Sequence, residues 1–287
     1  MTTQEGARYD RQITQRLSEW LIPSRHLIEI AELMRILLTN DDGVFAPGLR
    51  ALRKELRRLG DVTVVAPAQE QSGVGHSITL LTPLVVKAVD EEDGSTLGYM
   101  VEGSPADSVK LAILELMDRP PDLIVSGINA GANVGINVLY SGTVAAAIEG
   151  AFFKITSVAV SLELAEHFDY PHAARQAVRV IESILANKPA NGSLFNVNLP
   201  AHARGEPKGV QTVPMGIGRH GECFERRTDP RGRTYYWLSY APPYNLEGEH
   251  TDVSCLTDGY ITVTPLHFDL TRKDQMKELQ GWTWPKI

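Results

Sequence analysis

The sequence has few cysteines and no long apolar run. These two features argue against a disulfide-rich secreted protein and against a membrane-spanning protein. Cys223 and Cys255 are the only cysteines among 287 residues, and no C-x-x-C spacing joins them. They predict a reducing compartment, and neither a disulfide scaffold nor a thiolate metal site. No apolar run approaches the roughly 20 residues that span a membrane, and the first residues lack the apolar core of a signal peptide. We therefore expect a cytoplasmic protein without a membrane partner.

Excess positive charge is also absent. Lys and Arg number 28 against 35 Asp and Glu, which gives a formal net charge of -7. Broad binding to a nucleic-acid backbone needs clustered positive charge, so we expect no nucleic-acid polymer as a partner. A small anionic substrate remains compatible with this charge, because a metal ion can reverse the sign of one pocket.

Apolar runs and amphipathic segments alternate along the chain from Met34 onward. Buried strands are predicted at 35–39, 62–66, 122–127, 157–162 and 194–200. Helices are predicted between them, at about 47–60, 105–116, 143–153 and 172–186. This alternation predicts an α/β fold with a mainly parallel sheet covered on both faces by helices.

The two ends of the chain differ from this pattern. After about Gly209 the sequence is β-rich, with a hairpin in "RRTDPRGRTYYWLSY", a strand in "GYITVTPL" and a helix at 270–279. We read 210–287 as an extension of a core at 34–209 rather than as an independent domain. Residues 1–33 form an appendage, with short amphipathic helices broken at Pro23. Either a docking segment or a misassigned start would explain it.

Two neighbouring acids follow the first predicted strand. Asp41 and Asp42 stand in "TNDDG", and Gly43 permits the turn that both need in order to serve one site. Two carboxylates held close together are costly unless a cation neutralises them or one binds a proton. The alternative is an ordinary turn in which one acid caps the backbone and the other faces water.

Two further loops offer neutral oxygen ligands. Asn129 and Asn133 lie in "SGINAGANVG", and Ser72 lies in "QSG". Each alone is equally well explained as a turn residue. Because the carboxyl ends of parallel strands meet at one edge of a sheet, we expect these loops to gather beside the acids. An oxygen-only set favours a hard divalent cation over zinc.

A fourth segment resembles an anion site. Ser141, Gly142 and Thr143 precede an Ala-rich helix whose first N–H groups have no partner within the helix. Such a helix start attracts phosphate, and hydroxyl groups assist. The alternative is a simple N-cap. Together with a metal at the same edge, the segment indicates phosphate chemistry.

Two known phosphate motifs do not account for these segments. The P-loop pattern G-x-x-x-x-G-K-[ST] is absent. A haloacid-dehalogenase-type phosphatase places a nucleophilic Asp where this chain has Asn40. Asn cannot form an aspartyl-phosphate, so the likeness fails at the residue that it needs most.

One histidine and one aromatic cluster are further candidates for the predicted site. His76 is close enough to the predicted site in sequence to act as an acid for the leaving group, but a polar residue at the rim is the better interpretation. Tyr235, Tyr236 and Trp237 are suited to stacking a nucleobase, but alternating strand packing is the better explanation. Neither is included in the predicted site.

Several long motifs, in this order, resemble the SurE family of survival proteins, which are metal-dependent nucleotidases. They are "RILLTNDDGVFAPG", "VVAPAQEQSGVGHSIT", "GSPADSVKLA", "DLIVSGINAGANVG", "LYSGTVAAAIEG", "DPRGRTYYWL" and "TDVSCLTDGYITVTPL". The resemblance extends from Met34 to about Thr271 and leaves residues 1–33 outside it.

The resemblance implies a Rossmann-like three-layer core, a β-rich C-terminal extension and an exchanged C-terminal segment that serves oligomerisation. It implies one divalent cation per subunit, Mg²⁺ or Mn²⁺, for which Ca²⁺ can substitute in a structure. The implied metal ligands are Asp41, Asp42, Ser72 and Asn129. The implied catalytic residues are Asp41, Asp42 and Asn133. The implied phosphate site consists of Ser141, Gly142 and Thr143. Which acid orients the attacking water stays open.

The implied activity is hydrolysis of nucleoside 5′- and 3′-monophosphates to nucleoside and phosphate, with short-chain polyphosphate as a further substrate. The implied assembly is a homodimer or homotetramer. Two alternatives remain: a non-catalytic sensor of nucleotides or phosphate on the same fold, and an assembly protein that recruits a partner through residues 1–33.

Overall fold

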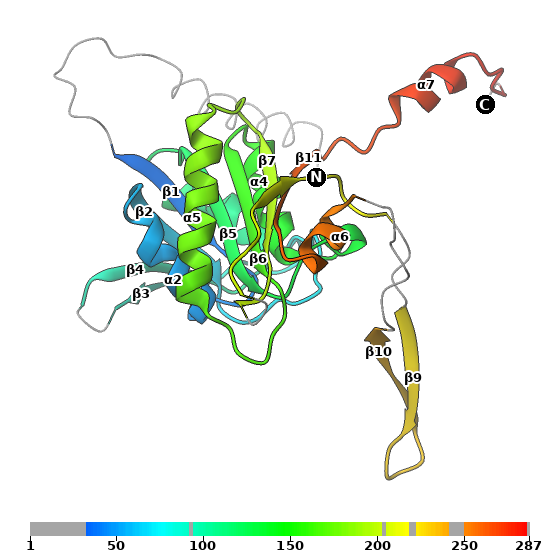
Figure 1. The fold of residues 1–287 in the computed structure, drawn as a ribbon, viewed down its shortest axis with the longest axis horizontal. Coiled ribbons are helices and arrows are strands. Elements are labelled where there is room, and N and C mark those ends of the chain that lie inside the picture. Colours follow the sequence, from blue (N-terminus) through cyan, green and yellow to red (C-terminus); the bar gives the residue numbers. More distant parts are fainter. Residues whose placement is uncertain (1–32, 92–93, 203–204, 218–221, 241–249, 286–287) are drawn as a thin grey trace.

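The computed structural model describes residues 33–91, 94–202, 205–217, 222–240 and 250–285. The predicted appendage therefore lies outside the described residues, except for Leu33. Over the described ranges, the predicted α/β fold with a mainly parallel sheet is confirmed (Figure 1). No helix in these ranges combines the length and the apolar character needed to cross a membrane.

A nine-stranded sheet forms the centre of the fold, with strand order β3-β4-β2-β1-β5-β6-β7-β11-β8. Its parallel strands are β1 (Met34–Thr39), β2 (Gly60–Pro67), β4 (Thr96–Val101), β5 (Leu123–Ala130), β6 (Thr156–Leu162) and β7 (Leu194–Leu199). The remaining strands are β3 (Val86–Asp90), antiparallel to β4, and β11 (Ile261–Leu266), antiparallel to β7 and parallel to β8 (Val210–Thr212). The C-terminal strands thus extend the main sheet.

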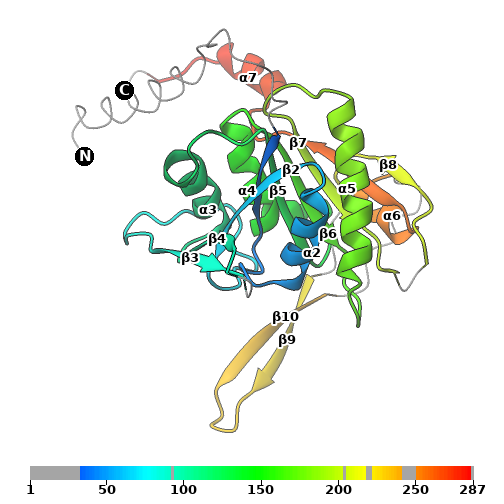
Figure 2. The same ribbon diagram turned by 90° about the vertical axis from the view of Figure 1, so that its left-hand side faces the viewer.

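Helices cover both faces of the sheet (Figure 2). On one side lie α2 (Pro47–Leu56) and α5 (Tyr170–Ala186), and on the other lie α3 (Pro105–Leu111) and α4 (Gly142–Phe152). Successive residues of a strand point to opposite faces. In β1, Leu38 belongs to the cluster that includes Leu49 of α2, and Leu37 belongs to the cluster that includes Val109 of α3. Both faces are buried, which is why apolar residues predominate in the central strands.

Beyond β7, the predicted hairpin and tail are present. Strands β9 (Glu222–Thr228) and β10 (Thr234–Tyr240) form a separate antiparallel hairpin that projects from the body (Figure 1). Helix α6 (Asp252–Thr257) precedes β11, and α7 (Lys273–Gln280) follows it without a buried residue. The sequence did not predict β3, β4, β8, α6 or the short helical segment η2 (Gly135–Leu139). The helix predicted at 105–116 is present as α3 followed by a π-helical turn, η1 (Ala112–Leu116).

Candidate active site

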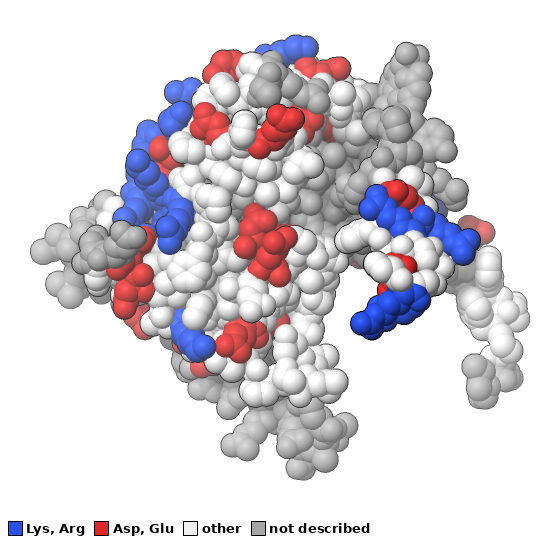
Figure 3. Space-filling model, turned by 90° about the horizontal axis from the view of Figure 1, so that it is seen from below, with Lys and Arg blue, Asp and Glu red and all other residues white. Residues whose placement is uncertain are grey.

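The predicted site residues lie at the carboxyl edge of the parallel strands, in loops, at the end of β5 and at the start of α4. This edge faces downward in Figure 1 and toward the viewer in Figure 3. On this face acidic side chains gather near the middle, and Lys and Arg gather along one margin and on the projecting hairpin (Figure 3). The loops after β1, β2 and β5 meet the start of α4 here, as the contacts below show.

A tight turn holds both acids at the end of β1. Asn40 is fully buried, and its side-chain nitrogen donates to the carbonyl oxygen of Gly43 at 3.0 Å. Gly43 has a φ of +100°, a conformation that favours glycine. The turn places Asp41 and Asp42 on the carboxyl edge together, which the sequence alone left open.

Asp41 is buried against the start of α4. Its carboxyl is 5% exposed and accepts a hydrogen bond at Oδ1 from the hydroxyl of Thr143. Burial raises the pKa of Asp41, and the Thr143 hydrogen bond acts in the opposite direction. The backbone carbonyl of Asp41 also accepts from Gln71 N at 2.8 Å, which ties the loop after β2 to the site.

Gly142 allows this close approach of α4. A Cβ at this position would lie 2.9 Å from the Cβ of Asp41, 3.1 Å from its Oδ2 and 3.1 Å from Cγ of Pro105. Ser141 is the N-cap of the helix, and its Oγ accepts from Val144 N at 3.1 Å. The N-cap interpretation of Ser141 therefore describes the structure, and its contact with phosphate stays a prediction.

Asp42 titrates well above the ordinary range of an aspartate. Burial raises its pKa to about 6, and the neighbouring charges of Asp41 and Glu70 act in the same direction. Its Oδ2 accepts from Ala130 N at 3.2 Å, which brings the end of β5 to the acids. The pKa of Tyr170 is also raised, by burial and by the charge of Asp42. The site thus concentrates negative charge where a cation would relieve it.

Asn129 lies beside this contact, next to Ala130. The register of β5 against β6 shifts between Ser126 and Asn129, so the strand is irregular as it reaches the edge. The Asn129 side-chain nitrogen donates to the carbonyl oxygen of Gly131 at 2.7 Å. This orients the amide so that Oδ1 is the atom available as a ligand, which suits a hard cation.

The loop after β2 contributes Ser72 and an acid that the sequence analysis missed. The hydroxyl of Ser72 donates to Glu70 Oε1 at 2.6 Å, and both residues are exposed. Glu70 raises the pKa of both Asp41 and Asp42, so its carboxylate faces the same site. In the sequence, Glu70 stands in "APAQEQSG", two residues before Ser72, and that proximity was its only signal.

Asn133 lies in a different environment from the other predicted residues. Its side-chain nitrogen donates to Ser161 Oγ at 2.8 Å, and its backbone N–H donates to Asn198 Oδ1 at 2.8 Å. Its backbone carbonyl accepts from the side chain of Asn196 at 2.7 Å. These bonds fix the loop after β5 to β6 and β7. The catalytic role of Asn133 stays a prediction.

The donor set at the acids fits a hard divalent cation. Asp41, Asp42 and Asn129 offer oxygen atoms, and Ser72 is linked to them through Gln71. Burial and the charges of neighbouring acids raise the pKa values of both acids, and a cation bound between them would offset that repulsion. Mg²⁺ and Mn²⁺ prefer such oxygen ligands, whereas zinc sites include nitrogen or sulfur.

Thr143 offers a test of how Asp41 is tuned. We expect Thr143→Val to raise the pKa of Asp41 further, because the hydroxyl donor is lost while the shape is kept. A proton then competes more strongly with the cation for Asp41, and the carboxyl is held less firmly, so Mg²⁺ affinity near neutral pH should fall. Thr143→Ser, which keeps the donor, is the control. Calorimetric Mg²⁺ titration checks this, and equal affinity in Thr143→Val and wild type would contradict it.

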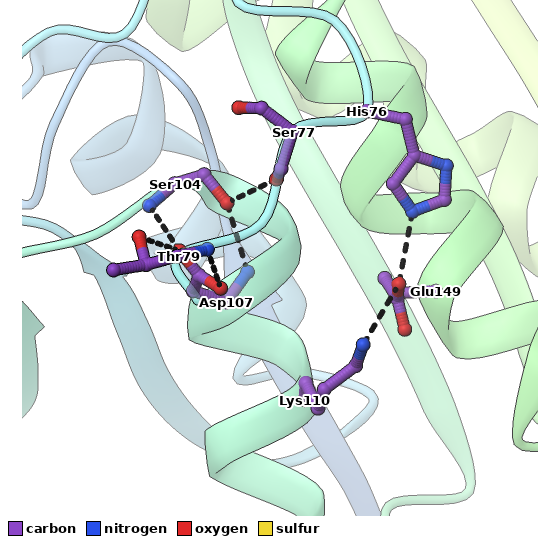
Figure 4. A network of polar contacts seen from close by, with 7 residues as sticks. All are labelled: His76, Ser77, Thr79, Ser104, Asp107, Lys110 and Glu149. Atoms are coloured by element: carbon purple, nitrogen blue, oxygen red, sulfur yellow. Dashed lines mark hydrogen bonds and ion pairs between the residues drawn. The ribbon is translucent and has the colours of Figure 1, made fainter. Parts of the chain in front are cut away.

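His76 contacts the side of α4 rather than the acids (Figure 4). Its Nε2 lies 2.9 Å from Glu149 Oε1, and Lys110 Nζ lies 3.5 Å from the same oxygen. Glu149 is 3% exposed and stands seven residues beyond Gly142, roughly 10 Å along the helix axis. His76 is therefore an anchor for the loop at the rim of the site, which agrees with the interpretation preferred from the sequence.

A second set of contacts fixes the same loop three residues later (Figure 4). Asp107 accepts from Thr79 N at 3.0 Å, from Thr79 Oγ1 at 2.7 Å and from Ser104 N at 2.9 Å. Burial alone raises the pKa of Asp107, but the hydrogen bonds from Thr79 and Ser104 outweigh it and lower the pKa. The segment from Gln71 to Thr79 is thus attached to β1, α3 and α4 at once.

The His76 anchor predicts a measurable coupling. We expect His76→Ala to lower the free energy of unfolding by about 1–2 kcal/mol, because the buried Glu149 then loses one of the two side chains that contact its Oε1 among the described residues. The effect of His76→Ala should shrink in a Glu149→Gln background, since the contact is already weakened there. Urea unfolding of the four proteins measures this coupling. Additive effects would show that the two side chains do not interact.

Comparison with known proteins agrees with the resemblance found in the motifs. The family model described as "Survival protein SurE" matches residues 36–222. A protein of Rhodopirellula baltica named 5′-nucleotidase SurE is 57% identical over 250 residues, which cover 87% of this chain and 98% of that protein. A protein of Desulforamulus reducens with the same name is 42% identical over 252 residues, with 87% and 98% covered.

A solved structure gives the same result for the fold. The SurE protein from Aquifex aeolicus superposes with a TM-score of 0.75 at 38% sequence identity, and the match covers 86% of this chain and 98% of that one. The family model, the relatives and the fold agree over most of the chain, including the loops that carry Asp41, Asp42 and Asn129. This chain belongs to the SurE family.

Proposed function

We propose that this protein is a 5′-nucleotidase that hydrolyses nucleoside monophosphates to nucleoside and phosphate. Its relatives at 57% and 42% identity carry that name over nearly their whole length. The observation that carries the proposal is the pair Asp41 and Asp42, held at the sheet edge against the start of α4. An acidic pair beside a helix N-terminus suits a phosphate ester bound through a cation.

The proposed cofactor is one divalent cation per subunit, Mg²⁺ or Mn²⁺, held by Asp41, Asp42, Ser72 and Asn129. When bound, such an ion acts as a Lewis acid toward a phosphoryl oxygen and lowers the pKa of a water molecule. The oxygen-only donor set and the raised pKa values of both acids support this assignment. Ser72 would need to turn its hydroxyl from Glu70 toward the acids.

The protein's own groups have separate tasks in the proposed reaction. The N–H groups at the start of α4, from Gly142 and Thr143, face the phosphate and stabilise its charge, with Ser141 and Asn133 at its margin. Asp42 orients the attacking water, because it is the more exposed acid of the pair. Thr143 holds Asp41 in one orientation. Positioning and electrostatics do most of the work in phosphoryl transfer.

Metal binding should depend on pH near 6. The pKa of Asp42 in the folded protein is about 6, and a cation binds the deprotonated carboxylate. Below pH 6 a proton competes with the cation, so apparent Mg²⁺ affinity should fall about tenfold between pH 7.5 and pH 5. Calorimetry at several pH values tests this. An affinity that is flat over this range would contradict the raised pKa.

The activity itself is tested by phosphate release from a panel of substrates. Nucleoside 5′-monophosphates, 3′-monophosphates and short polyphosphates are each assayed with Mg²⁺, with Mn²⁺ and with a chelator. We expect release from 5′-monophosphates that the chelator abolishes, with 3′-monophosphates and polyphosphate as further substrates. Measurable metal binding without release from any substrate would replace the enzyme with a sensor on the same fold.

We further propose a homodimer or homotetramer in the cytoplasm, with the C-terminal segment exchanged between subunits. Tyr236 and Trp237 of the projecting hairpin are 60% and 59% exposed, so strand packing within the main core does not explain them. Trp282 and Trp284 beyond α7 are similarly exposed. Apolar surface of this kind is expected to be covered by a second subunit. A molecular mass of 31.6 kDa, that of the monomer, measured by light scattering in solution would overturn the proposal.

A further inference from the structure

A group of nitrogen and oxygen ligands lies apart from the acidic pair. His172 stands in the first turn of α5, which follows β6, and His202 and Glu206 stand in the segment after β7. One ligand atom from each of the three lies within 4.8 Å of the others. Strands β6 and β7 are parallel neighbours, so the segments that follow them leave the sheet at the same edge.

Two ligand atoms of this group are already separated as they would be around a bound metal ion. His172 Nε2 lies 3.3 Å from Glu206 Oε2, and the rings of His172 and His202 have centroids 4.6 Å apart. A tetrahedral zinc ion with bonds of about 2.0–2.1 Å holds its ligand atoms roughly 3.3 Å apart. The His172 and Glu206 atoms are therefore already at this spacing, and a ring nitrogen of His202 lies within 4.8 Å of both.

The side chain of Gln176 shows which way the ligand atoms point. Its Nε2 lies 2.7 Å from His172 Nε2 and 3.3 Å from Glu206 Oε2, so one amide N–H₂ group lies within reach of both atoms. His172 Nε2, Glu206 Oε2 and the Gln176 amide therefore converge on one place, where a metal ion could contact all three side chains.

The surroundings hold these ligands in place and favour a cation. Asp169 accepts from His172 N at 2.9 Å, which fixes the start of α5. Glu163 accepts from Ala201 N at 3.0 Å, which fixes the residue before His202. Glu163 and Asp169 line the same hollow as the two histidines. Glu206 adds a third carboxylate beside this hollow, and the summed negative charge attracts a cation.

We propose that His172, His202 and Glu206 form a second metal site, which takes a borderline transition-metal ion, best Zn²⁺. Two imidazoles and one carboxylate are a zinc donor set, unlike the oxygen-only set at Asp41 and Asp42. Gln176 supplies the fourth ligand through its carbonyl oxygen after the amide turns over. The ion joins the first turn of α5 to the segment after β7, so it stabilises the fold and is not required for hydrolysis.

Cobalt absorption and thermal unfolding test the site without an activity assay. Full-length protein is titrated with Co²⁺ in excess Mg²⁺, which fills the oxygen-only site. Wild type should bind one equivalent with the intense visible bands of four-coordinate Co²⁺, and Zn²⁺ should displace it and raise the unfolding midpoint. His172→Ala and Glu206→Gln should each weaken Co²⁺ binding by about a hundredfold or more.

The matched control is His267→Ala. His267 is an exposed histidine outside the group, and its Nδ1 accepts from Asp269 N at 3.0 Å. This control should bind Co²⁺ as wild type does. Glu206 is exposed, so Glu206→Gln keeps the test valid even if His172→Ala folds poorly. Equal Co²⁺ spectra and affinities in wild type and both ligand variants would overturn the proposal, as would the absence of a four-coordinate spectrum in wild type. Neither result bears on nucleotide hydrolysis.

Discussion

Replacing Asp42 with Asn is expected to lower metal-dependent phosphate release by about 10²–10³-fold and, in the metal-free protein, to raise the unfolding midpoint. The loss of activity follows because Asn removes a negative ligand and the group that orients the attacking water. The gain in stability follows because burial, and then the charges of Asp41 and Glu70, raise the pKa of Asp42 to about 6. Neighbouring carboxylates lower the free energy of unfolding when no cation offsets their charge.

The gain in stability has a defined pH window. The pKa of Asp42 rises from an ordinary value of 3.8 to about 6 on folding, so the folded protein holds the proton more tightly. Below pH 3.8 the Asp42 carboxyl therefore does not lower the free energy of unfolding. The destabilisation grows between about pH 4 and 6 and is complete above pH 6. Asp42→Asn should be more stable than wild type at pH 7.5 and equally stable near pH 4.

Thermal unfolding in chelator and phosphate release in Mg²⁺ measure the two effects on the same samples. Asp118→Asn is the matched control, since Asp118 is exposed and lies outside the site. It should change neither quantity. An Asp42→Asn protein that keeps full activity, or that is less stable than wild type without metal at pH 7.5, would refute the role given to this acid.

Gly142→Ala is expected to lower phosphate release by about tenfold to a hundredfold with little loss of stability. The new Cβ would lie 2.9 Å from the Cβ of Asp41 and 3.1 Å from Cγ of Pro105, so Asp41 must shift. Small displacements of a catalytic group are costly, and a shift of 1 Å can reduce a rate about a hundredfold. Ala is the better helix former by about 1 kcal/mol, which offsets part of the strain.

The control is Gly281→Ala, the same change after α7, where the nearest atom to the new Cβ is Glu278 O at 3.4 Å. Both variants are compared in phosphate release, Mg²⁺ affinity and unfolding midpoint. A loss confined to activity and Mg²⁺ affinity is the predicted pattern for Gly142→Ala. Unchanged activity would mean that α4 does not need to lie so close to Asp41.

The core of the fold was predictable because its strands are buried on both faces. The runs at β1, β2, β5, β6 and β7 are mainly apolar and almost wholly buried, and such runs carry a strong signal. Strands β3 and β4 were missed. In β3 the burial is weak and polar residues are frequent, and Gly98 interrupts β4, so neither segment has a clear period.

The site was predictable only where neighbouring residues carried its chemistry. Asp41 and Asp42 are adjacent, and their mutual repulsion is visible in the sequence. The contact between His76 and Glu149 joins residues 73 positions apart, and no local pattern marks it. His172 and His202 likewise come together only when β6 and β7 pair. Long-range pairing, not local propensity, decides such contacts.

Anomalous scattering from Mn²⁺ in crystals of the wild-type protein tests the central claim most directly. We predict one strong peak within ligand-bond distance of the carboxylates of Asp41 and Asp42 and of Oδ1 of Asn129, and no peak there in Asp42→Asn. A Mn²⁺ ion found only at a place remote from both acids would contradict the account, because the raised pKa values would then have no cation to relieve them.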